Sequence, residues 1–359
     1  MYNFPIVGWL VWDPNPEFFV IPWLDWPIRW YGVFFALGFV LAYFVLQNLL
    51  QKLIIDTPKI NESYVKDWDL MIEKIKGVPI FSSSLKEWMY QHSKGGVIPS
   101  EIKTAILEEI HFGSLSKSLF EEALLSPKTI TQQLMDGLTW YVVIATIVGA
   151  RLGHILFYDW DHYLAHPLNI FKTWEGGLAS HGGAVAIPIA VVLFYRRYLY
   201  HLPQISLLTL MDRIAVVVPL AAFWIRLGNF FNQEIVGTFT TAPWAVIFGH
   251  PYEGSPGIPL HPVQLYEGLV YLLTFCILWM LSKKDPKPGF LCGLMFFLIF
   301  APRFVLEMFK QSPSGLLDFI PFQMGQLLSI PFILTGVILM NVSRRKKRVA
   351  KLAFENQIQ

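Results

Sequence analysis

The sequence predicts an all-α, polytopic membrane protein with seven transmembrane helices, its N-terminus outside and its C-terminus inside. Of the 359 residues, 54% are hydrophobic and only 15% are charged, whereas about a quarter of an ordinary soluble domain is charged. Seven apolar runs approach the roughly 20 residues that a helix needs to cross the hydrocarbon core. The Lys and Arg residues of the short loops follow alternate runs, which fixes the orientation.

The chain divides into segments of different composition. Residues 1–28 are rich in Trp, Phe and Pro, which suits the membrane interface, and 29–54 form the first span. Residues 55–137 alternate charged with apolar residues at helical spacing, so we expect a soluble helical insert. The other six spans lie within 138–342, a small extracytoplasmic cap is expected at 232–263, and a basic tail covers 343–359. The six runs are 138–158, 182–199, 207–231, 264–282, 289–308 and 324–342.

The basic residues of the loops set the sidedness. Arg196 and Arg197 follow the third span, Lys283 and Lys284 follow the fifth, and the tail follows the seventh, whereas 232–263 contains no Lys or Arg. By the positive-inside rule the C-terminus and the insert are cytoplasmic. An odd number of spans agrees with ends on opposite sides.

Several kinds of site are not expected. Cys276 and Cys292 both fall in apolar runs, so inert buried thiols are favoured over a disulfide. No Cys/His spacing typical of a metal site is present, and we expect neither a cofactor nor a nucleic-acid partner. The N-terminus lacks the basic and apolar regions of a cleavable signal peptide.

Polar side chains recur near the outer ends of the spans. Charged and amide groups inside a bilayer are costly, which makes them candidates for a functional site. They predict one outward-facing polar cavity, although each basic residue alone could merely reach the interface. The residues are Arg29, Tyr31, Arg151, His181, Arg226, Asn229, Gln264, Tyr266, Glu267, Arg303 and Glu307, with Asn232 and Glu234 just after the fourth span.

Several arginines at headgroup depth favour an anionic ligand. A guanidinium presents a planar fork of donors that matches phosphate, so a phospholipid headgroup is the expected ligand. Asn229, Asn232, Gln264 and Tyr266 are suited to hydrogen bonds with hydroxyl or ester oxygens. Glu234, Glu267 and Glu307 would orient the arginines. The alternative is that these groups form only interhelical ion pairs.

His181 lies between two pairs of glycines, which allow sharp turns and close backbone approach at the membrane surface. An imidazole is well suited to accept a proton near neutral pH. A structural histidine is the alternative interpretation.

The polar motifs resemble those of the bacterial prolipoprotein diacylglyceryl transferases. The most specific is Arg226-Leu-Gly-Asn-Phe-Phe-Asn-Gln-Glu-Ile-Val-Gly237. The other matching motifs are Arg29-Trp-Tyr-Gly, Gly149-Ala-Arg-Leu-Gly-His-Ile-Leu-Phe-Tyr158, Glu175-Gly-Gly-Leu-Ala-Ser-His-Gly-Gly183, His261-Pro-Val-Gln-Leu-Tyr-Glu267, Arg303-Phe-Val-Leu-Glu307 and Met324-Gly-Gln-Leu-Leu-Ser329.

The resemblance implies a transferase of the bacterial cytoplasmic (inner) membrane with its active site on the periplasmic side. Such an enzyme moves the diacylglyceryl group of phosphatidylglycerol to the lipobox cysteine in the signal peptide of a prolipoprotein. A thioether forms and glycerol phosphate leaves, the first step of lipoprotein maturation. The family's functional positions match Tyr31, His181, Arg226, Asn229, Glu234, Gly237 and Arg303.

The resemblance also suggests a division of roles. Arg226 and Arg303 would clamp the phosphate, and His181 would take the thiol proton unless nearby cations lower the pKa of the thiol. Asn229 and Tyr31 would contact the glycerol headgroup, whereas Glu234 would hold Arg226 or an outer loop. Two departures stand out: the long insert, and Ile299 and Lys310 where many members have Tyr and Arg.

Two other functional classes are compatible with buried arginines. A secondary transporter for an anionic solute would place them at mid-depth, but the halves of the chain show no internal repeat. A lipid-binding assembly protein without catalysis is the second alternative.

Overall fold

The computed structural model describes residues 8–23, 25–55, 64–76, 103, 106–107, 123–173, 176–199, 205–284, 286–311 and 322–358. The chain forms two compact units, each described separately below: unit 1 is Met1–Leu46 with Met211–Gln359, and unit 2 is Gln47–Leu210. Within the described residues, seven helices are long and apolar enough to cross a membrane. The predicted helical membrane fold with seven spans is therefore confirmed.

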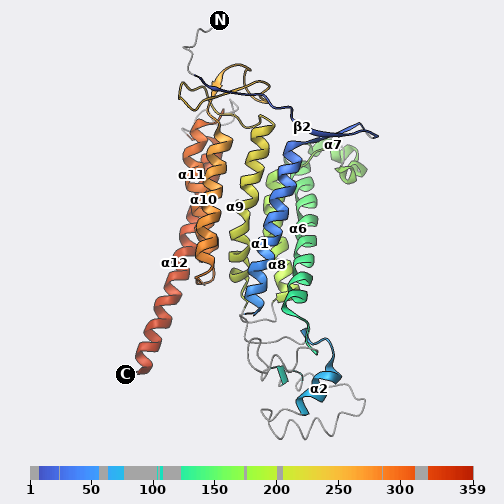
Figure 1. The fold of residues 1–359 in the computed structure, drawn as a ribbon, viewed down its shortest axis with the longest axis vertical. Helices are drawn as coiled ribbons and strands as arrows, with labels where there is room; N and C mark the ends of the chain where they lie inside the picture. Colours follow the sequence, from blue (N-terminus) through green and yellow to red (C-terminus); the bar gives the residue numbers. More distant parts are fainter. Residues whose placement is uncertain are drawn as a thin grey trace. The chain divides into compact units, whose positions relative to one another are not determined.

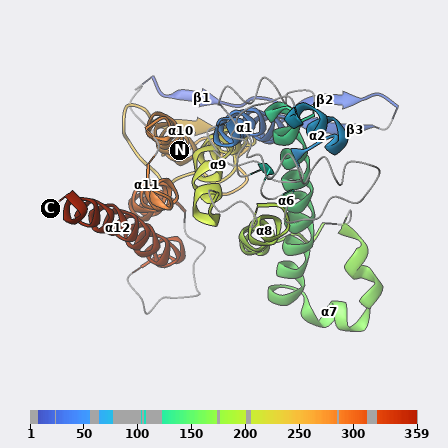
Figure 2. The ribbon, with the colours of Figure 1, turned by 90° about the horizontal axis from the view of Figure 1, so that it is seen from below.

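Unit 1 contains five of the long helices (Figure 1). They are α1 (Trp30–Ile55, up to Leu46), α9 (Leu207–Phe231, from Met211), α10 (Val263–Ser282), α11 (Phe290–Leu306, followed by the 3-10 turn η5, Glu307–Phe309) and α12 (Met324–Ile358). Helices α11 and α12 pack side by side (Figure 2). Their backbones come close where Gly293 and Gly336 face each other, because a Cβ at either would lie 2.7 Å from the other's carbonyl oxygen.

The N-terminal end of α11 is capped by another helix. Asp212, buried in the first part of α9, accepts hydrogen bonds from the backbone N–H groups of Gly289 (2.8 Å) and Cys292 (2.7 Å). Its neighbour Arg213 donates to the carbonyl oxygen of Ser282 at the end of α10 (3.4 Å). The carboxylate of Asp212 thus faces the positive N-terminal end of α11, and the guanidinium of Arg213 faces the negative C-terminal end of α10. Helix α9 therefore links α10 to α11.

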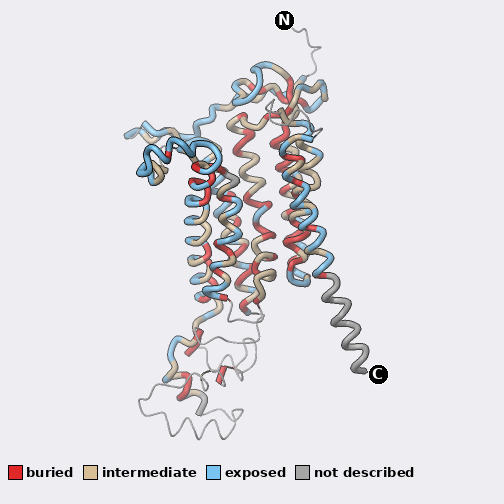
Figure 3. The backbone as a smooth tube through the Cα atoms, turned by 180° about the vertical axis from the view of Figure 1, so that it is seen from behind, coloured by how far each residue is buried: buried red, intermediate tan, exposed pale blue. Residues whose placement is uncertain are grey.

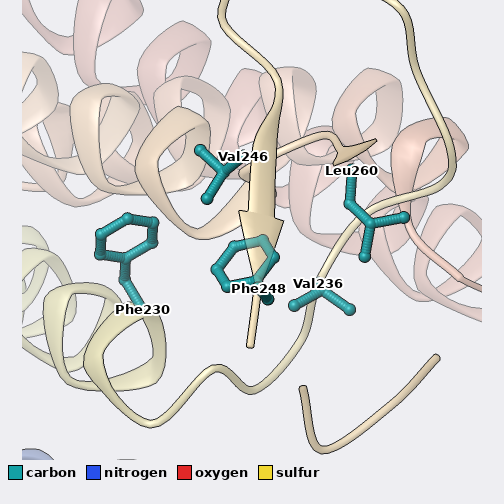
Figure 4. Close-up of a cluster of buried hydrophobic side chains, with 5 residues drawn as sticks. All are labelled: Phe230, Val236, Val246, Phe248 and Leu260. Carbon is teal, nitrogen blue, oxygen red and sulfur yellow. The ribbon is translucent and has the colours of Figure 1, made fainter. Parts of the chain in front are cut away.

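A small sheet lies at the opposite end of the unit 1 helices. Strand β1 (Leu10–Trp12) pairs in parallel with β4 (Val246–Phe248), and β4 pairs antiparallel with β5 (Pro259–Leu260). Its apolar core connects the expected cap, 232–263, to the end of α9. This cluster consists of Phe230, Val236, Val246, Phe248 and Leu260 (Figure 4).

The N-terminal segment has more regular structure than its composition suggested. A hairpin of β2 (Glu17–Ile21) and β3 (Trp26–Arg29) leads directly into α1. Its aromatic side chains are exposed, with Trp23 82% and Trp26 66% accessible. Such exposure is typical of an element whose apolar side chains face lipid rather than a protein core.

Unit 2 is built on α6 (Pro127–Phe157) and α8 (Ser180–Phe194), which continues as a short π-helix, η4 (Tyr195–Leu199). The two helices approach at Gly149, Gly153 and Gly182, where added Cβ atoms would overlap the facing backbone. Helix α7 (Trp160–Ala165) and the 3-10 turn η2 (Pro167–Phe171) follow α6.

The start of α6 corrects one predicted boundary. Ser126 caps α6 by accepting a hydrogen bond from the N–H of Thr129 (3.1 Å), and Pro127 occupies the first turn, where its missing N–H costs nothing. Residues 127–137, expected in the insert, are therefore the first turns of this helix. Most of the insert lies outside the described residues, apart from α2 (Trp68–Lys76) and a few positions.

Exposed residues recur along the spans (Figure 3), and many of them carry large apolar side chains. Phe44 of α1, Ile144 of α6 and Ile338 of α12 are more than half accessible. Helix α9 differs from the other spans. Half of its most apolar stretch is buried, whereas the buried share of the corresponding stretch is 22–33% in the other six helices. The helix that ends in the longest motif is thus the most enclosed of the seven spans.

Candidate active site

The motif 226–237 forms the end of α9 and a tight turn after it. The helix ends at Phe231, and Gln233 and Ile235 both adopt φ +57°. This left-handed region is unfavourable for a β-branched residue such as Ile235. The N–H of Glu234 bonds to the carbonyl of Asn229 (2.9 Å), so the chain folds back on the last turn of the helix.

This turn brings the motif's polar side chains into one hydrogen-bonded chain. Arg226 Nη1 donates to Asn229 Oδ1 (2.9 Å), and Asn229 Nδ2 donates to Glu234 Oε2 (3.0 Å). Asn232 Nδ2 donates to the other carboxylate oxygen of Glu234 (3.0 Å). Gln264, fully buried in α10, donates to the Glu234 carbonyl (2.6 Å). Glu234 therefore acts on Arg226 through Asn229 and not by direct contact.

Glu267 is the central charge of the site. Its side chain is 1% exposed in the second turn of α10, where a lone carboxylate would be costly. Three cations surround it: Arg226 Nε at 2.6 Å, Lys310 Nζ at 2.9 Å and Arg303 Nη1 at 3.9 Å. The C-terminal ends of α9 and α11 therefore meet the N-terminal end of α10 at one buried carboxylate.

Glu307 lies at the edge of the same cluster, beside α12. Lys310 Nζ is 3.1 Å from Glu307 Oε2. A Cβ added to Gly325, in the first turn of α12, would collide with the Glu307 carboxylate. The missing side chain at Gly325 thus allows Glu307 to approach the N-terminal end of α12, where the helix dipole favours an anion. Gln326 Nε2, in α12, donates a hydrogen bond to the carbonyl of Phe304 in α11 (3.1 Å).

Tyr31, in the first turn of α1, lies against α9. A Cβ at Gly228 would lie 3.0 Å from the Tyr31 ring, so this glycine permits the close packing. Arg29, just before the helix, is exposed and lies in β3.

The two ends of the cap are joined beside the cluster. Gly237 N–H donates to the carbonyl of His261 (2.9 Å), and a Cβ at Gly237 would lie 2.5 Å from that oxygen. Trp244 Nε1 donates to the Tyr266 hydroxyl (2.8 Å), which is 3.1 Å from His261 Nδ1. Partial burial lowers the pKa of His261 below its ordinary value. The neutral imidazole shares a hydrogen bond with the Tyr266 hydroxyl at Nδ1, and the tautomer of His261 decides which group donates.

Two predicted site residues lie in unit 2. The buried guanidinium of Arg151 donates to backbone carbonyls of the segment 169–177, including Ile170 (2.9 Å), Gly176 (2.7 Å) and Lys172 (3.1 Å), and lies over the ring of Tyr163. Arg151 thus holds the loop that leads to His181. The backbone of His181 is in the first turn of α8, but its side chain lies outside the part that the structure describes.

The structure brings most of the predicted residues together within unit 1 and adds others. Lys310 stood out in the sequence only as a departure from the family pattern, although its spacing from Glu307 is that of an i,i+3 ion pair. His261, Gly228 and Gly325 gave no separate signal. Their roles depend on contacts between helices that are distant in sequence.

Comparisons with known proteins identify relatives of this chain. The family model described as prolipoprotein diacylglyceryl transferase matches residues 110–342. A phosphatidylglycerol–prolipoprotein diacylglyceryl transferase of Protochlamydia amoebophila is 39% identical, over 93% of this chain and 94% of that protein. Proteins of the same name from Tolumonas auensis (45%, over 60% of this chain and 81% of that protein) and Chlamydia pneumoniae (40%, 66% and 83%) are also similar. The chain belongs to the prolipoprotein diacylglyceryl transferase family.

Proposed function

We propose that this protein transfers the diacylglyceryl group of phosphatidylglycerol to the lipobox cysteine of prolipoproteins. Family membership supports the reaction, and the names of its relatives specify both substrates. The supporting feature of the site is the cation cluster around Glu267, in which Arg303 is the least compensated guanidinium. It is 29% exposed and, among the described residues, its one ion pair spans 3.9 Å.

Arg303 and Arg226 have different parts in this reaction. Arg226 is held by Glu267 and Asn229, so its position is fixed before any lipid binds. Arg303 has donors left for a phosphate, which a guanidinium binds in bidentate fashion. Arg303 is therefore the primary phosphate ligand. Arg226, whose position is fixed by its partners, stabilises the negative charge of the phosphate.

The chemical step is a displacement at carbon. The cysteine sulfur forms a bond to the glyceryl carbon that carries the phosphate, and the C–O bond breaks. Glycerol phosphate leaves with the electron pair, and the thiol proton goes to a base. A free cysteine titrates near ~8.5, so proton removal or a cationic environment is needed near neutral pH. His181 is the proposed base.

The remaining assignments follow from this reaction. Tyr31, Asn229 and Asn232 are proposed to contact the glycerol headgroup, and the cap to guide the lipobox peptide. Within unit 2, Arg151 holds the loop that precedes His181, the proposed base. We place the site on the periplasmic side of the inner membrane, because the loops that follow spans three, five and seven carry the basic residues.

One experiment tests the function and separates it from transport or passive lipid binding. The purified protein is incubated with phosphatidylglycerol and a lipobox peptide, and the peptide is weighed by mass spectrometry. Only the transferase adds the diacylglyceryl mass. Arg303→Gln should lower turnover at least about a hundredfold, with exposed Arg196→Gln as a matched control.

The variants also test the individual roles. An unmodified peptide with wild-type protein would refute the function itself. Near-normal turnover in Arg303→Gln would refute the role of Arg303 as the phosphate ligand but not the proposed reaction. Full activity in His181→Gln would refute the role of His181 as the base, and activation of the thiol by nearby cations would then be the explanation.

A further inference from the structure

Among the residues that the structure describes, Lys310 is the one cation of the cluster that contacts two carboxylates. Its Nζ lies 2.9 Å from Glu267 Oε1 and 3.1 Å from Glu307 Oε2, and its side chain is only 11% exposed. The carboxylates come from different elements, α10 and η5. An ammonium suits this position because its three donors are not confined to one plane.

The backbone holds Lys310 firmly in this position. The 3-10 turn η5 ends at Phe309, and Lys310 is extended, with φ −84° and ψ 152°. The strand-like stretch pairs with the cap: Thr238 N–H donates to the Phe309 carbonyl (2.7 Å), and Gln311 Nε2 donates to the Gly237 carbonyl (3.0 Å). Gly237, the last residue of the family motif, is thus joined to Gln311, and Thr238 after it is joined to Phe309, so both neighbours of Lys310 are bonded to the cap.

The charges of the cluster depend on this lysine. Among the described side chains that form direct ion pairs here, Arg226, Arg303 and Lys310 face Glu267 and Glu307, which leaves one net positive charge in this set, whereas Glu234 is hydrogen-bonded to Asn229 and Asn232. The phosphodiester of phosphatidylglycerol carries one negative charge, so the cluster matches it. Without Lys310 the two carboxylates would face two guanidiniums. Arg303, the least paired of these, would then be drawn to a carboxylate instead of the phosphate.

We infer that Lys310 is a positioning residue that neutralises Glu267 and Glu307 and thereby keeps Arg303 available for the lipid phosphate. This inference rests on the proposed function. It concerns a residue that does not itself contact the reacting atoms. Its effect therefore appears in the affinity for the anionic lipid and for the phosphate product.

The test compares four variants in the lipid-transfer assay: Lys310→Met, Lys310→Arg, Lys310→Met/Glu307→Gln, and Lys284→Met as a control on an exposed lysine at the other end of α10. Lys310→Met should raise the KM for phosphatidylglycerol and the inhibition constant of glycerol phosphate by about tenfold or more, with a smaller change in kcat. Lys310→Arg keeps the charge and should stay within about threefold of the wild type.

The double variant separates charge from packing. Lys310→Met/Glu307→Gln restores one net positive charge, so it should bind glycerol phosphate better than Lys310→Met does. If Lys310→Met alone does not fold, the double variant is measured in its place. It should fold more readily because it contains one fewer carboxylate that needs a cationic partner.

Three results would overturn the inference while the wild type remains active. These are an unchanged KM in Lys310→Met, a loss in Lys310→Arg as large as in Lys310→Met, or a double variant no better than the single one. A wild type that adds no mass to the peptide would instead refute the proposed function.

Discussion

At the residue scale, the site shows how one buried charge organises the others. Glu267 is almost inaccessible, so each of its oxygens needs a cationic partner, and Arg226 and Lys310 provide them at 2.6 and 2.9 Å. A sequence pattern can mark these residues as costly in a membrane. It cannot assign the pairs, because Glu267 lies in α10, Arg226 in α9 and Lys310 just after η5.

The His261–Tyr266 pair gives a pH-dependent prediction. Because burial lowers the pKa of His261 in the folded protein, its neutral form favours folding. This contribution is full above the ordinary pKa of ~6.5 and is lost as the pH falls through that value toward the lower folded pKa. Thermal unfolding of the wild type should therefore show a loss of stability in acid that His261→Gln lacks.

A second variant isolates the hydrogen bond from the titration. Tyr266→Phe removes the hydroxyl between Trp244 and His261 and should lower stability at neutral pH by about 1 kcal/mol. An identical pH dependence in the wild type and in His261→Gln would contradict the assignment of the acid loss to this imidazole.

At the element scale, the long helices could be predicted and the short strands could not. An apolar run of about 20 residues is a strong signal in itself. Strands of two to five residues give no such signal, and β1 is stabilised by a partner far along the chain, β4. Asp212 was also missed, since its role as the cap of α11 depends on a neighbouring helix.

The attachment of the cap to the N-terminal segment gives an element-scale prediction. Gln233 donates to Asp13 Oδ1 (3.1 Å) and accepts from the His250 N–H (2.7 Å), and His250 Nδ1 also contacts Asp13 (2.8 Å). Gln233→Ala removes two of these bonds and should loosen the cap. If the cap guides the precursor, the KM for the lipobox peptide should rise several-fold, about the effect of 1 kcal/mol, with the lipid KM unchanged.

Kinetics with each substrate varied in turn make this measurement. Thr240→Ala, which removes a hydrogen bond within the cap but no contact to Asp13, is the matched control. A larger change in the lipid KM than in the peptide KM would contradict a peptide-guiding cap.

At the scale of the whole molecule, the predicted cavity drew residues from six spans, and the structure divides them between two units. Apart from Arg151 and His181, all the site candidates after the first span lie in unit 1, where the network runs from Arg226 in α9 through Glu267 in α10 to Glu307 in η5. Arg151 shows why motif membership does not define a role. Its donors are occupied by loop carbonyls, which no residue spacing reveals.

The insert is the last feature of the whole chain to be explained. Its two ends meet within unit 2: Lys66 N–H donates to the Ala123 carbonyl (2.8 Å), and Leu125 N–H donates to the Tyr64 carbonyl (2.8 Å). Residues 68–122 therefore leave and re-enter the fold at adjacent points. The 219 residues matched in the Tolumonas auensis relative make up 81% of that protein but 60% of this chain, so that family member has a shorter chain.

Excision of the insert should accordingly leave the reaction intact. In a variant with a short Gly-Ser linker between Asp67 and Ala123, loop closure costs little because these residues already contact each other, with Asp67 N–H 3.3 Å from the Ala123 carbonyl. Turnover of the lipobox peptide should stay within about threefold of the wild type, since every ion pair around Glu267 lies in unit 1. A variant that folds but loses more than about tenfold in turnover would show that the insert takes part in the reaction.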